Sequence, residues 1–344
     1  MTERILEAAR RLGYRADFAS QSLARRSPRT IGVYVPPDPW AGIGMSYESK
    51  ILQGIERSCH RRGYDLLVIN LGGNASPEIC GHRFTERRID GLILLHVSDD
   101  AAWLSPLLDE DDRVVAVNYY GPEARLRRVN FDDRAATALA VEHLVHMGHE
   151  RIAYAGIMSA RPGPGAVLRR EGFEQSTRQA GLVPHERWIM DRTRPFGDWP
   201  TEALDHAASG AYVADRLLEM SGPRPTALVC YGDLVAVGAI RRLKNHGIRI
   251  PQDISVTGID DMDICPYIDP PLTTIRQPLD DMGEQAAEML FEKMGKDSRK
   301  NSAAAHLSRP TFVPRQSTAA PRSTQEKPPR AEAASHERAA ASRT

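Results

Sequence analysis

The chain has 344 residues, 45 of them basic and 45 acidic, so its formal net charge is zero. This length allows two lobes that each bury a core, and the neutral balance excludes nucleic-acid binding through an overall excess of positive charge. The four cysteines form no CxxC pair, nothing at the N-terminus resembles a signal peptide, and no apolar run approaches the length of a membrane span, which together predict a soluble cytoplasmic protein.

Two short helical patterns lie within the first 29 residues. In residues 2–12 the apolar side chains share one face, and Gly13 ends the pattern. Residues 17–26 form a second candidate, which is too short to be stable in water unless something packs against it. On this string alone a solvated linker is the preferred interpretation. The alternative is a helix that folds on DNA through Leu23, Arg25 and Arg26.

From Thr30 onward, strand patterns and helix patterns alternate. The predicted strands cover residues 30–35, 64–70, 90–97, 113–118, 151–157, 188–190, 226–231 and 254–259. The predicted helices cover residues 47–62, 77–88, 134–147, 167–180, 210–220 and 234–245, and one more begins near Leu279. Strands separated by helices of this length imply right-handed crossovers and parallel sheets. We therefore predict an α/β protein with two doubly wound parallel-sheet lobes.

A pair of carboxylates, Asp260 and Asp261, directly follows the predicted strand 254–259. In open α/β sheets ligands bind beyond the carboxyl ends of the strands, so these acids lie where a binding site is expected. A polar residue, Gln277, follows on the next extended segment. The combination indicates a ligand site between two lobes rather than a catalytic centre.

The periodicity fades beyond about Lys296, where residues 306–314 are a candidate for one more strand. After Arg315 the chain contains no apolar residue larger than alanine. Such a segment cannot bury enough surface to offset its ordering entropy. We predict that residues 316–344 form a disordered tail.

Other motifs give no catalytic or metal site. The histidines within residues 143–149 resemble a metal cluster, but a zinc pair on a helix needs i, i+4 spacing and Gly148 ends this helix. The acids within residues 260–263 lack the glycine and the closing glutamate of a calcium loop. Neither a GxSxG elbow nor a catalytic Cys–His signature is present. We predict a protein that is not an enzyme and uses no metal and no cofactor.

Several strings together resemble the lactose-repressor/galactose-repressor (LacI/GalR) family of transcription regulators. They are ILEAARRLGYRADFASQSLARR-SPRTIGVYVP, VEHLVHMGHERIAYAG, RREGF, CYGDLVAVGAI, IPQDISVTGIDD and PPLTTIRQP. The resemblance covers about residues 2–315. It implies a periplasmic-binding-protein-like (type I) sensor of two lobes that forms a homodimer, and whose small-molecule effector alters its binding to operator DNA.

The resemblance also implies that the chain crosses between the lobes three times, and we place these crossings near Asn130, Gln277 and His306. The lobe boundaries then follow from the crossings. The N-terminal lobe comprises residues 30–130 and 278–306, and the C-terminal lobe comprises residues 131–277 and 307–315.

Ahead of the lobes, the resemblance implies a remnant DNA-binding headpiece in residues 1–29, with a third helix (2–12) and a hinge helix (17–26). The hinge residues expected to contact DNA are Ala19, Leu23, Arg25 and Arg26. The family's helix-turn-helix precedes the helix that begins here at Thr2, and such a unit needs about 20 residues. We expect that the start codon is assigned too far downstream. The alternative is a real truncation, a sensor that dimerises without finding an operator.

Effector-binding positions carry over from the resemblance one at a time. Asp260 matches the carboxylate that typically accepts hydrogen bonds from effector hydroxyls, and Arg169 in RREGF matches an effector-contacting arginine. For these two the alternative is an ordinary helix cap or a surface ion pair. Three further positions match polar or aromatic effector contacts, namely Tyr47, Asn118 and Gln277.

Two regions depart from the family pattern. Gly232 replaces the usual asparagine of an Asn–Asp pair, which removes one amide contact, while Asp233 remains as a candidate ligand. The aromatic wall of the site is Phe196 or Trp199, and the sequence does not decide between these two residues. Carboxylates, amides and a guanidinium suit the paired donors and acceptors of a polyol, and an aromatic wall suits the apolar face of a sugar.

The sequence therefore predicts an effector-responsive transcription regulator, a repressor that binds a sugar or polyol between its lobes. The rival interpretation is a cytoplasmic small-molecule sensor that does not bind DNA, because the recognition helix is absent from the sequence.

Overall fold

The computed structural model describes residues 27–36, 46–70, 79–97, 102–158, 162–192, 200, 204–295 and 305–322, together with residues 7, 11, 13, 22, 24 and 25. The two predicted headpiece helices therefore fall almost entirely outside the described residues. Individual predicted residues that also fall outside them are Ala19, Leu23, Arg26, Phe196 and Trp199.

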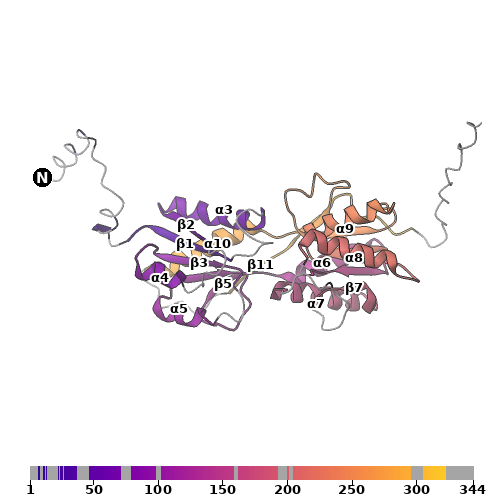
Figure 1. Cartoon of the computed structure of the whole chain (residues 1–344), viewed down its shortest axis with the longest axis horizontal. Helices are drawn as coiled ribbons and strands as arrows, with labels where there is room; N and C mark the ends of the chain where they lie inside the picture. Colours follow the sequence, from indigo (N-terminus) through magenta and orange to yellow (C-terminus); the bar gives the residue numbers. More distant parts are fainter. Residues whose placement is uncertain are drawn as a thin grey trace, which may run out of the picture.

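The first lobe is a six-stranded parallel sheet with helices on both faces (Figure 1). In sheet order its strands are β11 (Ala305–Ser308), β5 (Arg127–Phe131), β4 (Val114–Val117), β3 (Gly91–Leu95), β1 (Thr30–Val35) and β2 (Asp65–Asn70). One face packs against α3 (Ser46–Arg61) and α10 (Leu279–Met294), and the other against α4 (Ile79–Thr85) and α5 (Leu104–Glu110). Strand β1 is buried along its whole length because Ile31 and Val33 point into the first core and Tyr34 into the second.

The second lobe repeats this plan. Its sheet order is β12 (Thr311–Val313), β10 (Thr273–Arg276), β9 (Ser255–Asp260), β8 (Ala227–Cys230), β6 (Ile152–Ala155) and β7 (Ile189–Met190), and only β12 runs antiparallel to its neighbour. One face packs against α8 (His206–Glu219) and α9 (Asp233–Asn245), and the other against α6 (Asp133–His146) and α7 (Pro164–Gln179). A 3₁₀ turn, η1 (Glu186–Trp188), precedes β7. The predicted pair of doubly wound lobes is confirmed.

Three short elements differ from the prediction. Helix α5 and strand β5 have no counterpart in the predicted elements. The single strand expected within residues 306–314 is two strands, β11 and β12, which belong to different sheets. Arg309 and Pro310 lie between them, where the chain passes from one lobe to the other.

The chain crosses between the lobes three times. The first crossing joins β5 to α6, and the second joins β10 to α10 at Gln277. The third follows Ser308, later than predicted, because His306 pairs with Val129 inside the first sheet. The first and third segments lie next to each other, because the backbone N–H of Asp132 donates to the carbonyl oxygen of Ser308 at 3.0 Å.

Residues 314–322, here called the C-terminal strap, pack against the second lobe. Ser317 is fully buried, and it bonds to β9 through its carbonyl oxygen, which accepts from the backbone N–H of Val256 at 2.8 Å. Its hydroxyl accepts from the backbone N–H of Thr273 at 2.8 Å. The predicted tail is therefore wrong for residues 316–322. The strap is held by backbone and hydroxyl hydrogen bonds, which an argument from apolar burial does not count.

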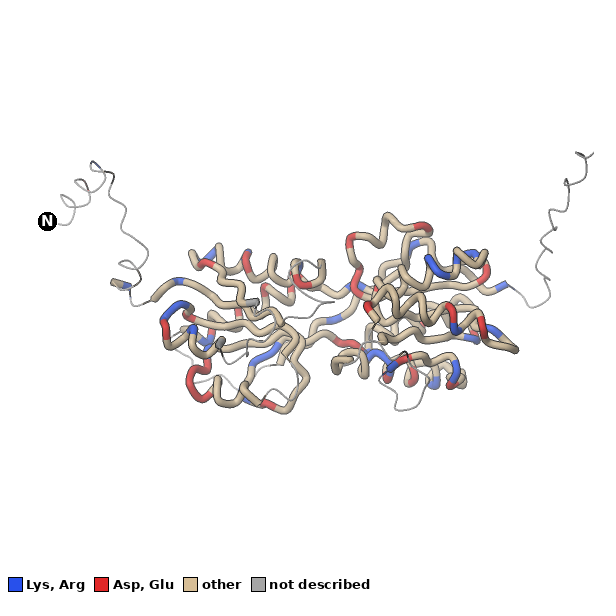
Figure 2. The backbone as a smooth tube through the Cα atoms, viewed as in Figure 1, with Lys and Arg blue, Asp and Glu red and all other residues tan. Residues whose placement is uncertain are grey.

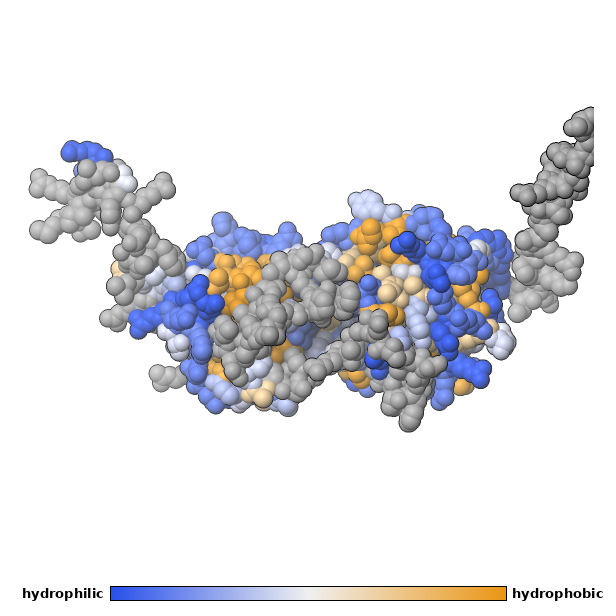
Figure 3. Space-filling model, in the orientation of Figure 1, coloured by the Kyte–Doolittle hydropathy of each residue, from blue (hydrophilic) through white to orange (hydrophobic). Residues whose placement is uncertain are grey.

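Acidic and basic residues are interspersed along both lobes (Figure 2), in keeping with the zero net charge. The face shown in Figure 3 is mainly hydrophilic over the helices, with apolar patches on both lobes. Within the described ranges, every helix is too short or too polar to span a bilayer.

Candidate effector site between the lobes

The candidate site lies where strands of both sheets reach their carboxyl ends. His96 follows β3, Asn118 follows β4, and Asp260 ends β9. All three have positive φ angles, of 48°, 56° and 115°. Residues other than glycine rarely adopt this conformation, and such strain is concentrated at functional sites.

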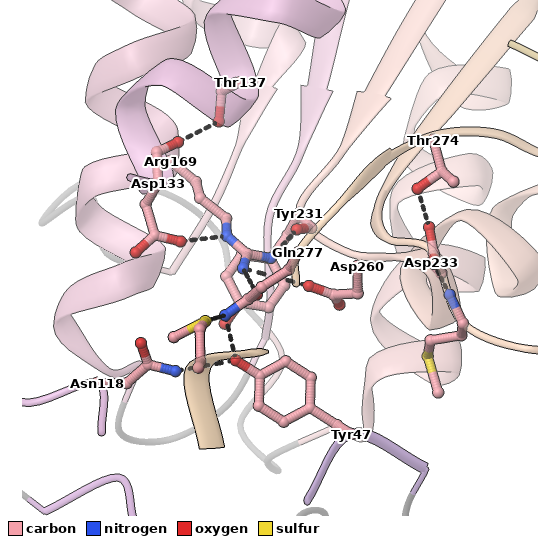
Figure 4. A network of polar contacts seen from close by, with 12 residues as sticks. Tyr47, Asn118, Asp133, Thr137, Arg169, Tyr231, Asp233, Asp260, Thr274 and Gln277 are labelled. Atoms are coloured by element: carbon pink, nitrogen blue, oxygen red, sulfur yellow. Dashed lines mark hydrogen bonds and ion pairs between the residues drawn. The ribbon is translucent and has the colours of Figure 1, made fainter. Parts of the chain in front are cut away.

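Arg169 on α7 is the centre of a buried network of polar contacts (Figure 4), and its side chain is only 5% exposed. Its Nε donates to Oδ1 of Asp133 at 2.7 Å, and Nη1 donates to the carbonyl oxygen of Tyr231 at 2.6 Å. Its Nη2 donates to Oδ1 of Asp260 at 3.3 Å and to Oε1 of Gln277 at 3.4 Å. One guanidinium thus joins the start of α6, the ends of β8 and β9, and the second crossing.

Burial and charge act in opposite directions within this network. Burial lowers the pKa of Arg169, but Asp260 and Asp133 raise it well above its ordinary value, so the guanidinium stays charged. Burial raises the pKa of Asp260 to about 7, although Arg169 opposes the shift. The opposing effect is limited because Arg169 is shared with Asp133. The Arg169 guanidinium also lies over the ring of Tyr231, 4.6 Å from the ring centroid.

The first lobe contributes Tyr47, from the first turn of α3. Its hydroxyl accepts from Nδ2 of Asn118 at 2.9 Å and from Nε2 of Gln277 at 2.7 Å. Burial, with a contribution from Asp260, raises the pKa of Tyr47 well above 10, so the hydroxyl keeps its proton. Since both contacts are accepted, that proton is available for donation. Oδ1 of Asn118 is buried and, among the described residues, accepts no hydrogen bond.

Direct contacts join the two lobes at the site. The hydroxyl of Tyr120, which precedes β5, donates to Oδ2 of Asp133 at 2.6 Å. Nζ of Lys50 on α3 lies 2.7 Å from Oδ1 of Asp263, which follows β9. Because these contacts cross from one lobe to the other, a change in the angle between the lobes has to alter them.

Asp233, which was predicted as an effector ligand, lies outside the Arg169 network (Figure 4). It is fully buried, and its carboxylate accepts from Oγ1 of Thr274 at 2.5 Å and from the backbone N–H of Met262 at 2.7 Å. These bonds fasten α9 to β10 and to the segment after β9. Next to it, a Cβ on Gly232 would lie 3.1 Å from Oδ2 of Asp260, so the glycine leaves space beside that carboxylate.

The structure brings together five of the eight predicted effector residues, namely Tyr47, Asn118, Arg169, Asp260 and Gln277. Sequence reasoning missed Asp133, Tyr120 and Tyr231. Tyr231 ends a predicted strand, so its position offered the same signal that singled out Asp260. Asp133 follows β5, and without that strand in the prediction nothing marked the aspartate as a site residue.

Two of the histidines considered as metal ligands have structural contacts. Nε2 of His149 lies 2.9 Å from the carbonyl oxygen of Ala319, and Nε2 of His143 lies 3.0 Å from Oγ1 of Thr318. Both contacts fasten the C-terminal strap. Across the part of the chain that the structure describes, no three histidine, cysteine or acidic side chains are grouped as a metal site.

Comparison with known sequences finds transcriptional repressors. The periplasmic binding protein-like domain family matches residues 141–318. The chain is 30% identical over 295 residues to the HTH-type transcriptional repressor PurR of Photobacterium profundum, covering 85% of this chain and 82% of the relative. It is 31% identical over 296 residues to PurR of Vibrio cholerae, with the same coverage.

Comparison with solved structures gives the same family. A LacI family transcriptional regulator from Enterococcus faecium with bound ribose is 26% identical, with a TM-score of 0.69 over 85% of this chain and 100% of that structure. The lac repressor dimer bound to operator and the anti-inducer ONPF is 25% identical, with a TM-score of 0.74 over 92% of this chain and 90% of that structure. The chain belongs to the LacI/GalR family of ligand-responsive transcription regulators, as its motifs predicted.

Proposed function

We propose that the Arg169-centred site binds a sugar or related polyol as its effector, and that this binding changes the affinity of a homodimer for operator DNA. The observation that carries the proposal is the set of hydrogen-bonding atoms available between the lobes. Tyr47 offers a donor, while Asn118 Oδ1 and the carboxylate of Asp260 offer acceptors. Closely spaced hydroxyls both donate and accept, so a polyol satisfies all of these atoms.

Each residue has a distinct role in this proposal. Asp260 has a side chain that is 13% exposed, and it accepts from effector hydroxyls. Arg169 is bonded to four protein acceptors, and it serves chiefly to orient Asp260 and Gln277. Tyr47 donates to an effector oxygen from the first lobe. An effector held by Tyr47 and Asp260 at once favours one angle between the lobes.

Effector binding is coupled to DNA binding because residues of both lobes hold the effector. An effector stabilises the lobe arrangement that it contacts best, and the coupling free energy in such systems is typically about 1–3 kcal/mol. The ribose-bound regulator supports a sugar effector, and the lac repressor dimer bound to operator supports a dimer that binds DNA.

The effector class is tested by a thermal-shift screen of the protein against sugars, sugar acids, polyols and purines. We expect one sugar or polyol to raise the melting temperature, since a ligand at about 100 times its Kd stabilises the folded state by about 2.7 kcal/mol. Asp260→Ala should abolish the shift. Asp269→Ala, at an exposed aspartate paired with Lys244, should retain it. A shift given only by purines, or a sugar shift that survives in Asp260→Ala, would contradict the proposal.

The DNA step is tested by gel retardation with fragments from the region upstream of the gene, using protein expressed from the complete gene. We expect the compound found in the screen to change the retardation of at least one fragment, and to have no effect with Asp260→Ala. Retardation that is identical with and without the compound would show that ligand binding and DNA binding are not coupled.

A further inference from the structure

The C-terminal strap reaches the backbone next to the effector site through Arg315. The backbone N–H of Arg315 donates to Oγ1 of Thr273 at 3.0 Å, and Nη1 donates to the carbonyl oxygen of Leu272 at 2.8 Å. Nη2 donates to Oδ1 of Asp261 at 2.6 Å. The side chain of Arg315 is 16% exposed, and that of Asp261 is 8% exposed. The strap thus holds the residue that directly follows Asp260.

Asp260 and Asp261 have a backbone conformation that needs support. Their φ angles are 115° and 56°, in the left-handed region that residues other than glycine rarely adopt. Such residues persist only where surrounding contacts fix them. Asp260 is the last residue of β9 that pairs with β10, and the backbone N–H of Met262 is anchored on Asp233. Between these two anchors, the shortest contacts made by the described residues are those of the Asp261 carboxylate, at 2.6 and 2.8 Å.

Two arginines share the Asp261 carboxylate, and they differ in burial. Nε of Arg276 donates to Oδ2 of Asp261 at 2.8 Å, but the Arg276 side chain is 54% exposed. Water and salt screen an exposed pair, so this contact fixes little. Arg315 is mostly buried, and the hydrogen bonds of the strap to the second sheet fix its backbone. Its planar guanidinium bonds to two acceptors at once, which sets their relative positions.

We infer that Arg315 is a positioning residue of the effector site, which holds Asp261 and thereby keeps the Asp260 carboxylate in the orientation that receives effector hydroxyls. The inference rests on the proposed function, because it assigns a further residue to the same site. Arg315 acts through Asp261 and not through a contact with the effector. The C-terminal strap therefore takes part in effector recognition from outside the cleft.

Crystal structures of the wild type and of Arg315→Met, both without ligand, test the geometry. Oδ1 of Asp260 lies 3.3 Å from Nη2 of Arg169 in the wild type. In Arg315→Met we expect this distance to exceed about 3.5 Å, so that the hydrogen bond is lost. Arg276→Met should retain it. An Asp260 that keeps this bond in Arg315→Met overturns the inference, whether or not any sugar binds.

Isothermal titration calorimetry measures the consequence for binding. The probes are ribose, glucose and galactose, each with its monodeoxy derivatives. A monodeoxy sugar that Asp260→Ala binds as tightly as the wild type does lacks the hydroxyl held by Asp260. We expect Arg315→Met to bind the parent sugar about tenfold more weakly, as the loss of one charge-assisted hydrogen bond accounts for. Its Kd for that monodeoxy sugar should be unchanged. An equal loss for both sugars would mean that the lobe is loosened as a whole, and would overturn the inference.

Three matched variants serve as controls. Arg276→Met removes the other cation from Asp261 and should weaken binding of the parent sugar by about twofold or less. Arg322→Met removes a strap arginine that lies 3.7 Å from Asp253 and is 42% exposed, and it should leave the Kd unchanged. Arg315→Lys keeps the charge without the forked guanidinium, so it should limit the loss to about threefold. If Arg315→Met does not fold, as judged by its thermal unfolding without ligand, Arg315→Lys replaces it.

The outcomes separate this inference from the proposed function. If no sugar binds the wild type while another compound class stabilises it, the sugar proposal is wrong, and the crystal structures still decide the role of Arg315. If a sugar binds Arg315→Met as tightly as the wild type, the inference is wrong and the sugar proposal stands. A loss in Arg322→Met as large as that in Arg315→Met would assign the effect to the stability of the strap, and would also overturn the inference.

Discussion

At the scale of single residues, the site depends on one buried cation shared by two acids. Arg169 holds Asp133 at 2.7 Å and Asp260 at 3.3 Å, and all three side chains are nearly excluded from solvent. Removing one partner from such a group leaves buried charge that nothing compensates, so the network is costly to break even where its net contribution to stability is small. A surface ion pair, which was the alternative for Arg169 and Asp260, does not fit this burial.

Arg169→Met should therefore destabilise the protein severely. We expect the free energy of unfolding to fall by about 3–5 kcal/mol, because Asp133 and Asp260 lose their shared cation. Urea denaturation near neutral pH measures the loss. Arg178→Met, on the same helix and paired with Glu174 in an exposed position, should change stability by no more than about 0.5 kcal/mol. Equal losses in the two variants would show that Arg169 acts only as an ordinary helix residue.

Stability should also depend on pH through Asp260. Burial raises its pKa from 3.8 to about 7, so between these pH values the folded state retains a proton that the unfolded chain has released. This contribution to stability is complete below pH 3.8 and is lost as the pH rises through 7. Asp260→Asn cannot titrate, so the wild type should lose stability relative to the variant across this range.

Urea denaturation at a series of pH values measures that difference. Asp253→Asn is the control, because the hydrogen bond from Arg249 lowers the pKa of Asp253 and places its titration below the window. The Asp253 variant should differ from the wild type by a constant amount between pH 4 and 7. A wild type that instead gains stability relative to Asp260→Asn as the pH rises would contradict the assignment of a protonated Asp260.

At the scale of elements, two helix pairs come into backbone contact through glycines. A Cβ on Gly54 of α3 would lie 1.9 Å from the carbonyl oxygen of Asp280 on α10, and a Cβ on Gly283 would lie 2.1 Å from the carbonyl oxygen of Ile51. Helices α8 and α9 meet in the same way through Gly210 and Gly238. The first pair fixes the helix that carries Tyr47, so its packing also positions the site.

Gly54→Ala should destabilise the first lobe although alanine favours helices. The intrinsic gain of about 1 kcal/mol is outweighed because the methyl group forces α3 and α10 apart, and overpacking costs about 1–3 kcal/mol beyond that gain. Thermal and urea unfolding measure the net effect. Gln53→Ala, at the exposed neighbouring position, should be neutral within about 0.5 kcal/mol. A Gly54→Ala protein that is more stable than the wild type would rule out the close contact.

The sequence predicted long elements with strong periodicity and missed those defined by tertiary context. Strand β1 matches its prediction at both ends, because all six of its residues are apolar, small or β-branched. Helix α5 has seven residues and contains Pro106, so its local pattern is weak. Strand β5 alternates between buried and half-buried residues but includes three polar side chains, which hid it in the sequence.

The sequence predicted only part of the candidate site, and the reasons are similar. Asp260 and Gln277 stand at strand ends that the sequence indicates, and Arg169 was found only through the family motif. Asp233 was found through another family motif, CYGDLVAVGAI, yet it bonds to Thr274 and Met262, which lie far from it in the chain. No local pattern shows whether such an acid faces a ligand or the protein interior.

At the scale of the whole molecule, contacts of different strength join the two lobes. The Lys50–Asp263 ion pair is one of them, and its side chains are 30% and 76% exposed. Exposed pairs of this kind contribute about 0–1 kcal/mol and weaken with salt. A contact of that strength can adjust the balance between lobe angles without fixing it, which suits a sensor that has to respond to its ligand.

Lys50→Met should weaken effector binding by up to about fivefold at low salt, because it removes a contact present when the lobes face each other. The loss should shrink at high salt. Calorimetry with the effector found in the screen measures both values. Lys244→Met removes an ion pair to Asp269 that lies within the second lobe, and it should leave the affinity unchanged. A loss that does not depend on salt would mean that Lys50 contacts the effector itself.

The three crossings also determine when each lobe can be completed during protein synthesis. The first sheet needs β11 and the second needs β12, and both strands lie within residues 305–313. Until the ribosome has released that segment, β5 and β10 each present an unpaired edge to other chains in the cell. A nascent chain halted before residue 305 therefore leaves two incomplete sheets, and both become complete together only once residues 305–313 have been made.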